Sequence, residues 1–170
     1  MVRKSFWTLL YKCYDLALVV AQKLGVSSQK TRKSWDEYFM GITIQVSERG
    51  TCDRAKVGCV ITKDNEIVST GYNGSVSGLV HCDDVGHLLV NGHCVRTVHA
   101  EQNAIYRAKR SLNSATVYVT HKPCLICTKA LLQNGVSRIV YARGYGVSEE
   151  GEIADELCKA KGVNVEKYDN

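Results

Sequence analysis

Three potential metal ligands and one carboxylate stand at spacings that suit hydrolytic chemistry. Cys124 and Cys127 lie three residues apart, so at the start of a helix both sulfurs point to one side and can share one zinc ion. His99 can supply a third ligand, which leaves one coordination position for a water whose pKa would fall towards roughly 7. Glu101, two residues after His99, would leave a helix in another direction and suits proton transfer.

The order of these residues, His-x-Glu followed by Pro-Cys-x-x-Cys, is typical of zinc-dependent nucleobase deaminases. In that chemistry a zinc-activated water attacks C4 of cytosine. We expect Glu101 to accept a proton from the water and then to protonate N3 and the departing amine. The alternative is that Cys124 and Cys127 serve a redox or purely structural site, and the paired His-x-Glu motif argues against it.

Charge and length narrow the class of substrate. The 170 residues suffice for one ordinary hydrophobic core. The net charge is +5, but residues 1–33 hold seven of the 22 basic residues and one of the 17 acidic residues. Residues 34–170 are therefore nearly neutral, which disfavours a nucleic-acid polymer as substrate and favours a small molecule.

Cysteine content and hydropathy predict the compartment. Eight cysteines occur with five histidines and a Cys-x-x-Cys motif, a combination that favours reduced thiols and metal over disulfides. The apolar stretch at 16–20 is too short to span a membrane, and no cleavage site for secretion follows it. We expect a cytoplasmic protein without a transmembrane segment.

The pattern of apolar residues predicts the elements that hold these side chains. Residues 1–33 form a basic accessory helix and connector, and the main domain covers residues 34–170. Ser34 and Glu37 predict a capping box. An apolar stripe at helical spacing follows it, made of Trp35, Tyr38, Phe39, Ile42 and Val46.

Strands and helices alternate after this first helix. The predicted strands are 57–62, 67–72, 115–120, 137–141 and 163–166, with a turn at Asp64-Asn65. Helices are predicted at 99–110, 124–133 and 150–161, and a glycine-rich loop at 73–97. This order predicts an α/β fold: a three-layer α/β/α sandwich around a mixed five-stranded sheet, with parallel pairing late in the chain.

Residues 34–145 resemble the deoxycytidylate (dCMP) deaminase family, in its zinc-rich bacterial and phage branch that includes the late-competence type. The resemblance rests on residues 34–40 (SWDEYFM), 51–53 (TCD), 57–58 (VG), 70–75 (TGYNGS), 93–96 (HCVR), 99–104 (HAEQNA) and 118–120 (YVT). It implies a cytidine deaminase-like fold and conversion of dCMP to dUMP. It also implies a homo-oligomer, with a hexamer favoured, and dCTP and dTTP as effectors, with Mg²⁺ accompanying the effector.

The resemblance also suggests residues beyond the catalytic set. Asn73 in the Gly-Tyr-Asn-Gly turn corresponds to a residue that contacts the nucleotide, although a plain turn residue is the alternative. Tyr145 lies where the family often has a tyrosine that faces the site. Cys52, Cys82 and Cys94 match cysteines of the zinc-rich branch, in which a structural zinc would hold the glycine-rich loop.

Several assignments stay open at this stage. For the fourth ligand of the second zinc we favour His87, where the branch has cysteine, with His81 and His93 as rivals. Cys13, Cys59 and Cys158 have no partner at metal spacing and are expected in the core. The surface cations Arg54, Lys56 and Arg96 are available for the phosphate. Rival functions are a tRNA adenosine deaminase and a non-catalytic zinc-binding module associated with competence.

Overall fold

The computed structural model describes residues 32–144 and 148–169. The chain divides into two units, Met1–Lys33 and Ser34–Asn170, and all the elements below belong to the second. The accessory helix predicted in the first unit lies outside the described residues. Among the described helices, none has the length and apolar character needed to cross a bilayer.

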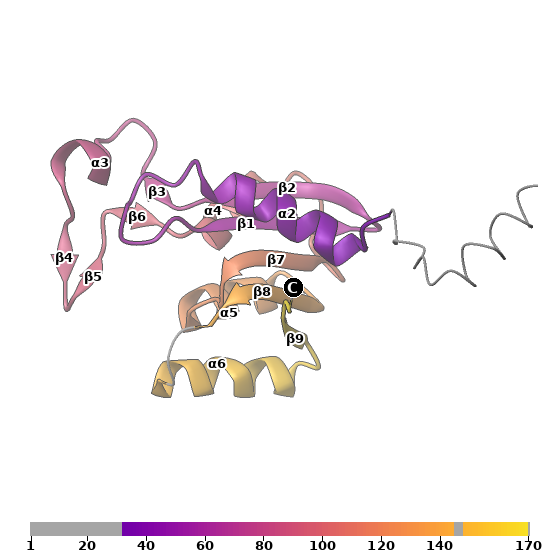
Figure 1. The fold of residues 1–170 in the computed structure, drawn as a ribbon. Helices are drawn as coiled ribbons and strands as arrows, with labels where there is room; N and C mark the ends of the chain where they lie inside the picture. The colour runs from indigo at the N-terminus through magenta and orange to yellow at the C-terminus, as the bar shows by residue number, and fades with distance from the viewer. Residues whose placement is uncertain (1–31, 145–147, 170) are drawn as a thin grey trace, which may run out of the picture. The chain divides into compact units, whose positions relative to one another are not determined.

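Five strands form the central sheet, in the order β2-β1-β7-β8-β9 (Figure 1). β1 (Gly58–Lys63) pairs antiparallel with β2 (Glu66–Tyr72) and with β7 (Thr116–His121). β8 (Arg138–Arg143) pairs parallel with β7 and with β9 (Asn164–Lys167). The predicted mixed sheet, with its parallel strands late in the chain, is confirmed.

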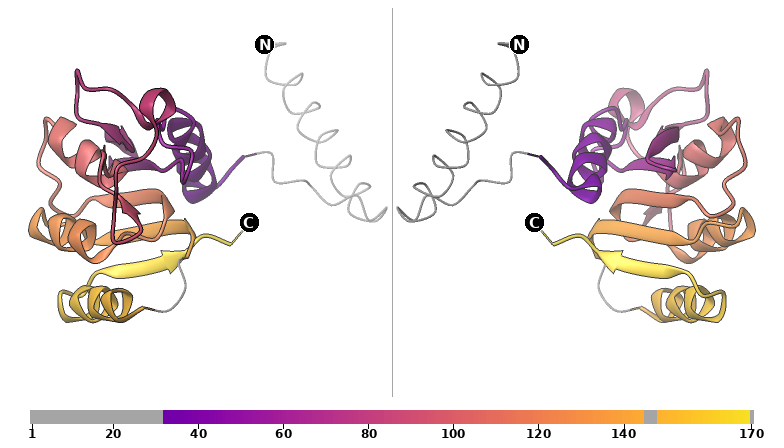
Figure 2. Two further views of the ribbon diagram at one scale, coloured as in Figure 1. Left: turned by 90° about the vertical axis from the view of Figure 1, so that its left-hand side faces the viewer. Right: turned by 90° about the vertical axis from the view of Figure 1, so that its right-hand side faces the viewer.

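Helices cover both faces of the sheet because successive strand residues point to opposite sides. On one face Phe39 and Met40 of α2 (Trp35–Ser47) pack against Val60, Tyr118 and Val140. α4 (Ala100–Arg107) and α5 (Leu125–Gln133) lie on the other face (Figure 2), and α6 (Glu149–Ala160) adds Cys158 to the same core. The α/β/α sandwich predicted from the sequence is confirmed.

Two glycines let helices approach the sheet more closely than a side chain would allow. A Cβ on Gly58 would lie 2.3 Å from the carbonyl oxygen of Thr43 in α2. A Cβ on Gly71 would lie 2.2 Å from the carbonyl oxygen of Ala100. Gly71 therefore fixes the first turn of α4 against β2, and this turn begins directly after His99.

The chain between β2 and α4 forms an arm, residues 74–98, that extends beyond the sheet (Figure 1). Its base pairs β3 (Gly74–Ser75) with β6 (Thr97–Val98). Beyond the base lie α3 (Cys82–Val85) and a small hairpin of β4 (Leu89–Val90) and β5 (His93–Cys94). The sequence predicted a plain loop here, because elements of two to four residues are too short to produce a periodic pattern.

One detail of the helix predictions was wrong, and a second feature could not be predicted. α4 ends at Arg107 instead of 110, since Ala108 adopts an extended conformation (ψ 124°). The apolar stripe of α2 is buried only in part: Phe39 is 2% exposed, whereas Trp35 and Tyr38 are 50% and 48% exposed. The helix instead buries Thr43 beside Gly58, where a larger side chain would not fit.

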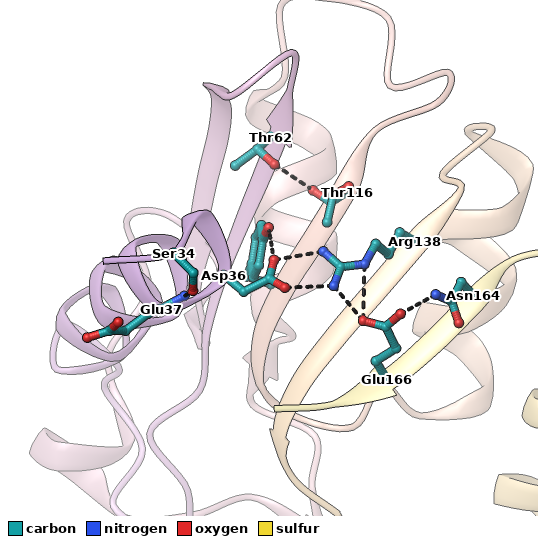
Figure 3. A network of polar contacts seen from close by, with 9 residues as sticks. Ser34, Asp36, Glu37, Thr62, Thr116, Arg138, Asn164 and Glu166 are labelled. Carbon is teal, nitrogen blue, oxygen red and sulfur yellow. Dashed lines mark hydrogen bonds and ion pairs between the residues drawn. The ribbon is translucent and has the colours of Figure 1, made fainter. Parts of the chain in front are cut away.

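A polar network joins the start of α2 to two parallel strands (Figure 3). Arg138 of β8 donates two hydrogen bonds to Asp36, at 2.7 and 2.8 Å, and also binds Glu166 of β9. The Tyr118 hydroxyl donates to the same Asp36 carboxylate at 2.7 Å. The bidentate pair with Arg138 lowers the pKa of Asp36. This network therefore joins the start of α2 to strands whose residues lie far from it in the sequence.

Candidate active site and second cysteine cluster

The first predicted ligand set comes together at two helix N-termini. His99 is the N-cap of α4, and Cys124 is the N-cap of α5. The His99 Nδ1 atom lies 3.4 Å from the Cys127 sulfur and 3.6 Å from the Cys124 sulfur. The three ligand atoms lie within 4.8 Å of one another, so all three could coordinate one tetrahedral zinc ion.

The ionisation of these groups also suits a cation. Hydrogen bonds from the Cys127 thiol and from His99 lower the pKa of Cys124 to about 4. The hydrogen bond with Cys124, followed by burial, raises the pKa of Cys127. The hydrogen bond between His99 and Cys124 raises the pKa of His99. A zinc ion would stabilise both sulfurs as thiolates.

Glu101 lies in the first turn of α4 and is only 4% exposed. Burial raises its pKa, and its carboxylate is also in contact with the Cys127 thiol. A carboxyl group whose pKa is raised towards neutrality can both accept and release a proton, as general acid–base catalysis requires. Its neighbour Cys59 is fully buried. Burial is the main cause that raises the pKa of this thiol, and the negative charge of Glu101 is the second.

A cavity of about 690 Å³ opens over this set. Part of its lining comes from the residues before β1, from Asn73 after β2 and from the arm, including Arg54 and His93. Another part, called here the α6 wall, comes from the end of β7 and from the start of α6, and its polar residues are His121, Lys122, Ser148, Glu150, Glu152 and Asp155. The volume lies in the usual range for small-molecule sites.

Asn73 lines the cavity but also shapes its wall. The side-chain oxygen accepts a hydrogen bond from the Val57 amide at 2.8 Å, and the side-chain nitrogen donates to the Ala55 carbonyl at 2.7 Å. The residue is 7% exposed. An amide can still offer one further donor and one further acceptor, so this bracing leaves capacity for a ligand. Tyr145, the second residue suggested for substrate contact, lies outside the described residues.

The second predicted set also comes together. The Cys52 sulfur lies 3.6 Å from the His87 Nδ1 atom, and the Cys82 and Cys94 sulfurs lie 3.6 Å apart. All four ligand atoms lie within 4.8 Å of one another. Of the three histidines considered, His87 alone joins this cluster; its Nε2 atom lies 3.1 Å from an Asp53 carboxylate oxygen.

The four ligands of this cluster come from the segment before β1 and from three places along the arm. Burial, followed by the Cys94 hydrogen bond, raises the pKa of Cys82 to about 12. Burial acts in the same direction on Cys94, but hydrogen bonds with the Arg96 amide and the Cys82 thiol lower its pKa to about 7. A closed set of three sulfurs and one imidazole matches the donors of a structural zinc site.

Several cavity residues were not foreseen from the sequence. Lys122, His121 and the carboxylates of α6 carry no spacing signal, because they meet only where the start of α6 reaches the cavity beside the residues at the end of β7. Of the three cations suggested for the phosphate, Arg54 lines the cavity, whereas Lys56 and Arg96 do not. Arg54 donates to the Gly92 carbonyl at 2.9 Å. Cys59 and Cys158 are buried as expected, and Cys13 lies outside the described residues.

Comparison with known proteins places this site in a family. A family model for the cytidine and deoxycytidylate deaminase zinc-binding region matches residues 33–143. The ComE operon protein 2 of Bacillus subtilis is 40% identical over 141 residues, covering 81% of this chain and 73% of that protein. The deoxycytidylate deaminase of Mycobacterium phage D29 is 37% identical over 126 residues, covering 66% of this chain and 98% of the phage protein.

A solved structure agrees with these relatives. The dCMP deaminase of the cyanophage S-TIM5, in complex with dCMP and dUMP, has a TM-score of 0.68 and is 28% identical, covering 81% of this chain and 99% of that one. The region that the family model matches contains the His-x-Glu and Pro-Cys-x-x-Cys residues of this chain. The chain therefore belongs to the cytidine and deoxycytidylate deaminase family.

Proposed function

We propose that this chain hydrolyses dCMP to dUMP and ammonia. The observation that carries the proposal is the buried Glu101 beside a three-ligand metal set, at the base of a cavity large enough for a nucleotide. Relatives called deoxycytidylate deaminase, and a similar structure that holds dCMP and dUMP, support this choice of substrate.

His99, Cys124 and Cys127 would hold the zinc ion, which supplies an activated water for attack on C4 of the cytosine. Glu101 would take the two protons of that water in turn, passing the first to N3 and the second to the leaving amine. Burial destabilises the charged carboxylate and so makes Glu101 a stronger base towards the water. Asn73 would contact the nucleotide from the wall that it braces, and Tyr145 is a second proposed contact.

The direct test follows the loss of dCMP absorbance and the appearance of dUMP with purified, zinc-loaded protein. Cytidine, cytosine and deoxycytidine serve as competing substrates. Turnover of dCMP with the highest kcat/KM is the expected result. If cytidine or cytosine is deaminated and dCMP is not, the proposed substrate is wrong.

We further propose that Cys52, Cys82, His87 and Cys94 bind a second, structural zinc that holds the arm against the domain. The closed four-ligand geometry supports this role, because it leaves no position for water. Metal analysis of the fully active protein should give two zinc ions per chain. A value of one zinc ion per chain in fully active protein would rule out the structural site.

The remaining expectations concern regulation and assembly. We propose a cytoplasmic homo-oligomer, with a hexamer favoured, that dCTP activates together with Mg²⁺ and dTTP inhibits. Mass measurement in solution and dCMP kinetics with each effector test these points separately.

Residues 1–33 are proposed as an accessory segment. If the role of this segment is targeting or partner binding, a truncation that begins at Ser34 should keep the oligomer mass, stability and activity.

A further inference from the structure

The charge on the α6 wall of the cavity poses a problem for an anionic substrate. Three carboxylates line this wall, from Glu150, Glu152 and Asp155. Neither Glu150 nor Glu152 forms an ion pair with another residue of 32–144 or 148–169. A phosphate that enters the cavity beside these exposed carboxylates would meet a like-charge repulsion that water and salt screen only in part.

Lys122 is the cation placed to offset this repulsion. Among the described residues, Lys122 and Arg54 are the only lysine and arginine that line the cavity, and Arg54 donates to the Gly92 carbonyl of the arm. Lys122 directly follows β7, at the carboxyl end of a strand that runs parallel to β8. Ligands of open α/β sheets bind at this end of the strands. Cys124, a ligand of the catalytic set, is only two residues further on.

Contacts with neighbouring residues position the Lys122 ammonium group beside the cavity. Its ammonium nitrogen lies 2.7 Å from an Asp155 oxygen and 5.8 Å from the centre of the Tyr141 ring. The side chain is 24% exposed, whereas Asp155 is 52% exposed. Lysine has three donor hydrogens, so it can bind Asp155 and still offer a donor to a second anion. Lys122 and Asp155 also border a smaller cavity of about 350 Å³, so this ion pair lies between the smaller cavity and the catalytic one.

We propose that Lys122 is a specificity-determining residue that offsets the carboxylates of the α6 wall, so that the site accepts a nucleotide carrying a 5′-phosphate. The inference rests on the proposed dCMP deamination and goes beyond it, because it names the group that distinguishes the nucleotide from the uncharged nucleoside. Asp155 holds Lys122 in place and at the same time weakens the positive potential that the phosphate meets.

This role predicts opposite effects from two substitutions that break the same ion pair. Lys122→Met keeps the apolar stem but leaves the α6 carboxylates uncompensated, so the KM for dCMP should rise about tenfold with kcat little changed. Asp155→Asn removes one negative charge and frees the ammonium group, so the KM for dCMP should fall about twofold to fivefold. The kcat/KM for deoxycytidine, which carries no phosphate, should stay within about twofold in both variants.

Two matched controls accompany these variants. Lys122→Arg keeps the positive charge and should keep the KM for dCMP close to that of the unaltered protein. Lys159→Met removes a lysine that borders the smaller cavity but not the catalytic one, and it should change neither substrate's kinetics. Zinc content and melting temperature show that each variant is folded and loaded. Asp155→Asn, which carries the opposite predicted sign, keeps the test decisive if Lys122→Met fails to fold.

The outcomes separate this inference from the proposed function. If the unaltered protein does not deaminate dCMP, the proposed function fails and the role of Lys122 fails with it. If dCMP is deaminated but both variants shift its KM in the same direction, the pair is structural and the inference is wrong. Equal changes for dCMP and deoxycytidine, or an unchanged KM for dCMP in Lys122→Met, would also overturn it.

Discussion

The two clusters of potential metal ligands differ in how the fold builds them. The catalytic set comes from the N-termini of α4 and α5, two helices packed on the central sheet, and offers three ligands beside a buried glutamate. The second set comes from the arm and the segment before β1, offers four ligands and has no buried carboxylate among them. A rigid sandwich can support an incomplete coordination shell, whereas an arm with little core of its own needs a complete one.

The largest expected effect separates catalysis from metal binding. Glu101→Gln keeps the size of the side chain but removes its ability to exchange protons, so kcat for dCMP should fall by about 10²- to 10⁴-fold. Because Glu101 is not one of the three ligands, the zinc content should not change. Steady-state kinetics and metal analysis of the same preparation measure both quantities. An unchanged rate would show that another group moves the proton.

The second prediction concerns the arm. Cys94→Ser removes one ligand of the closed set, so the variant should lose one zinc ion per chain and the amides of the arm should exchange hydrogen about a hundredfold faster. Strands β1 and β7 should keep their protection, since their core lies in the sandwich. Hydrogen exchange followed by mass spectrometry measures this. Cys158→Ser, a buried cysteine outside both sets, is the control for loss of a thiol.

The third prediction tests how firmly the sandwich holds the catalytic set. Gly71→Ala places a methyl group against the Ala100 carbonyl, where the available distance is 2.2 Å. The free energy of unfolding should fall by about 1–3 kcal/mol, and kcat should fall as well because the first turn of α4 must shift. Gly41→Ala is the matched control, since among the described residues the added carbon would meet no atom within 4 Å outside its own stretch of α2. Denaturant unfolding with both variants gives the comparison.

The smallest expected effect lies in the network that neither metal set touches. Asp36→Asn weakens the pair with Arg138 and should lower the free energy of unfolding by about 1 kcal/mol at neutral pH. The folded pKa of Asp36 is lowered, so its contribution is complete above the unfolded value of about 3.9 and is lost as the pH falls through the folded value. The free energies of unfolding of the variant and the unaltered protein should therefore differ at pH 7 and converge as the pH falls through the lowered pKa of Asp36. A constant gap would mean that Asp36 acts through packing alone.

The sequence predicted the catalytic set more fully than its surroundings. His99, Glu101, Cys124 and Cys127 lie in motifs whose spacing follows the geometry of two helix starts, so their meeting could be inferred in advance. The sandwich and the succession of strands and helices along the chain followed from periodicity for the same reason. Each of these features depends on local pattern, which a single sequence displays.

Features that depend on packing between distant segments could not be inferred in this way. Arg138 meets Asp36 across 102 positions of the chain, and Lys122 meets Asp155 across 33. Neither pair has a spacing that marks it, because each reflects how one element happens to lie against another. The exposure of Trp35 and Tyr38 has the same origin: helical periodicity identifies an apolar stripe but not which part of it the sheet covers.

The bracing of the 51–57 segment by Asn73 determines where this protein tolerates added residues. The Asn73 side chain binds the backbone of Ala55 and Val57, and the backbone carbonyl of Asn73 accepts a hydrogen bond from the Thr51 amide. These three bonds fix both the length and the shape of the segment. By contrast, the Asp64-Asn65 turn between β1 and β2 has no such template, and positive φ angles of 53° and 61° mark it as a two-residue hairpin connection. An epitope tag or a flexible reporter loop inserted there should leave the cavity intact, whereas the same insertion after Asp53 would separate Cys52 from the wall that it supports.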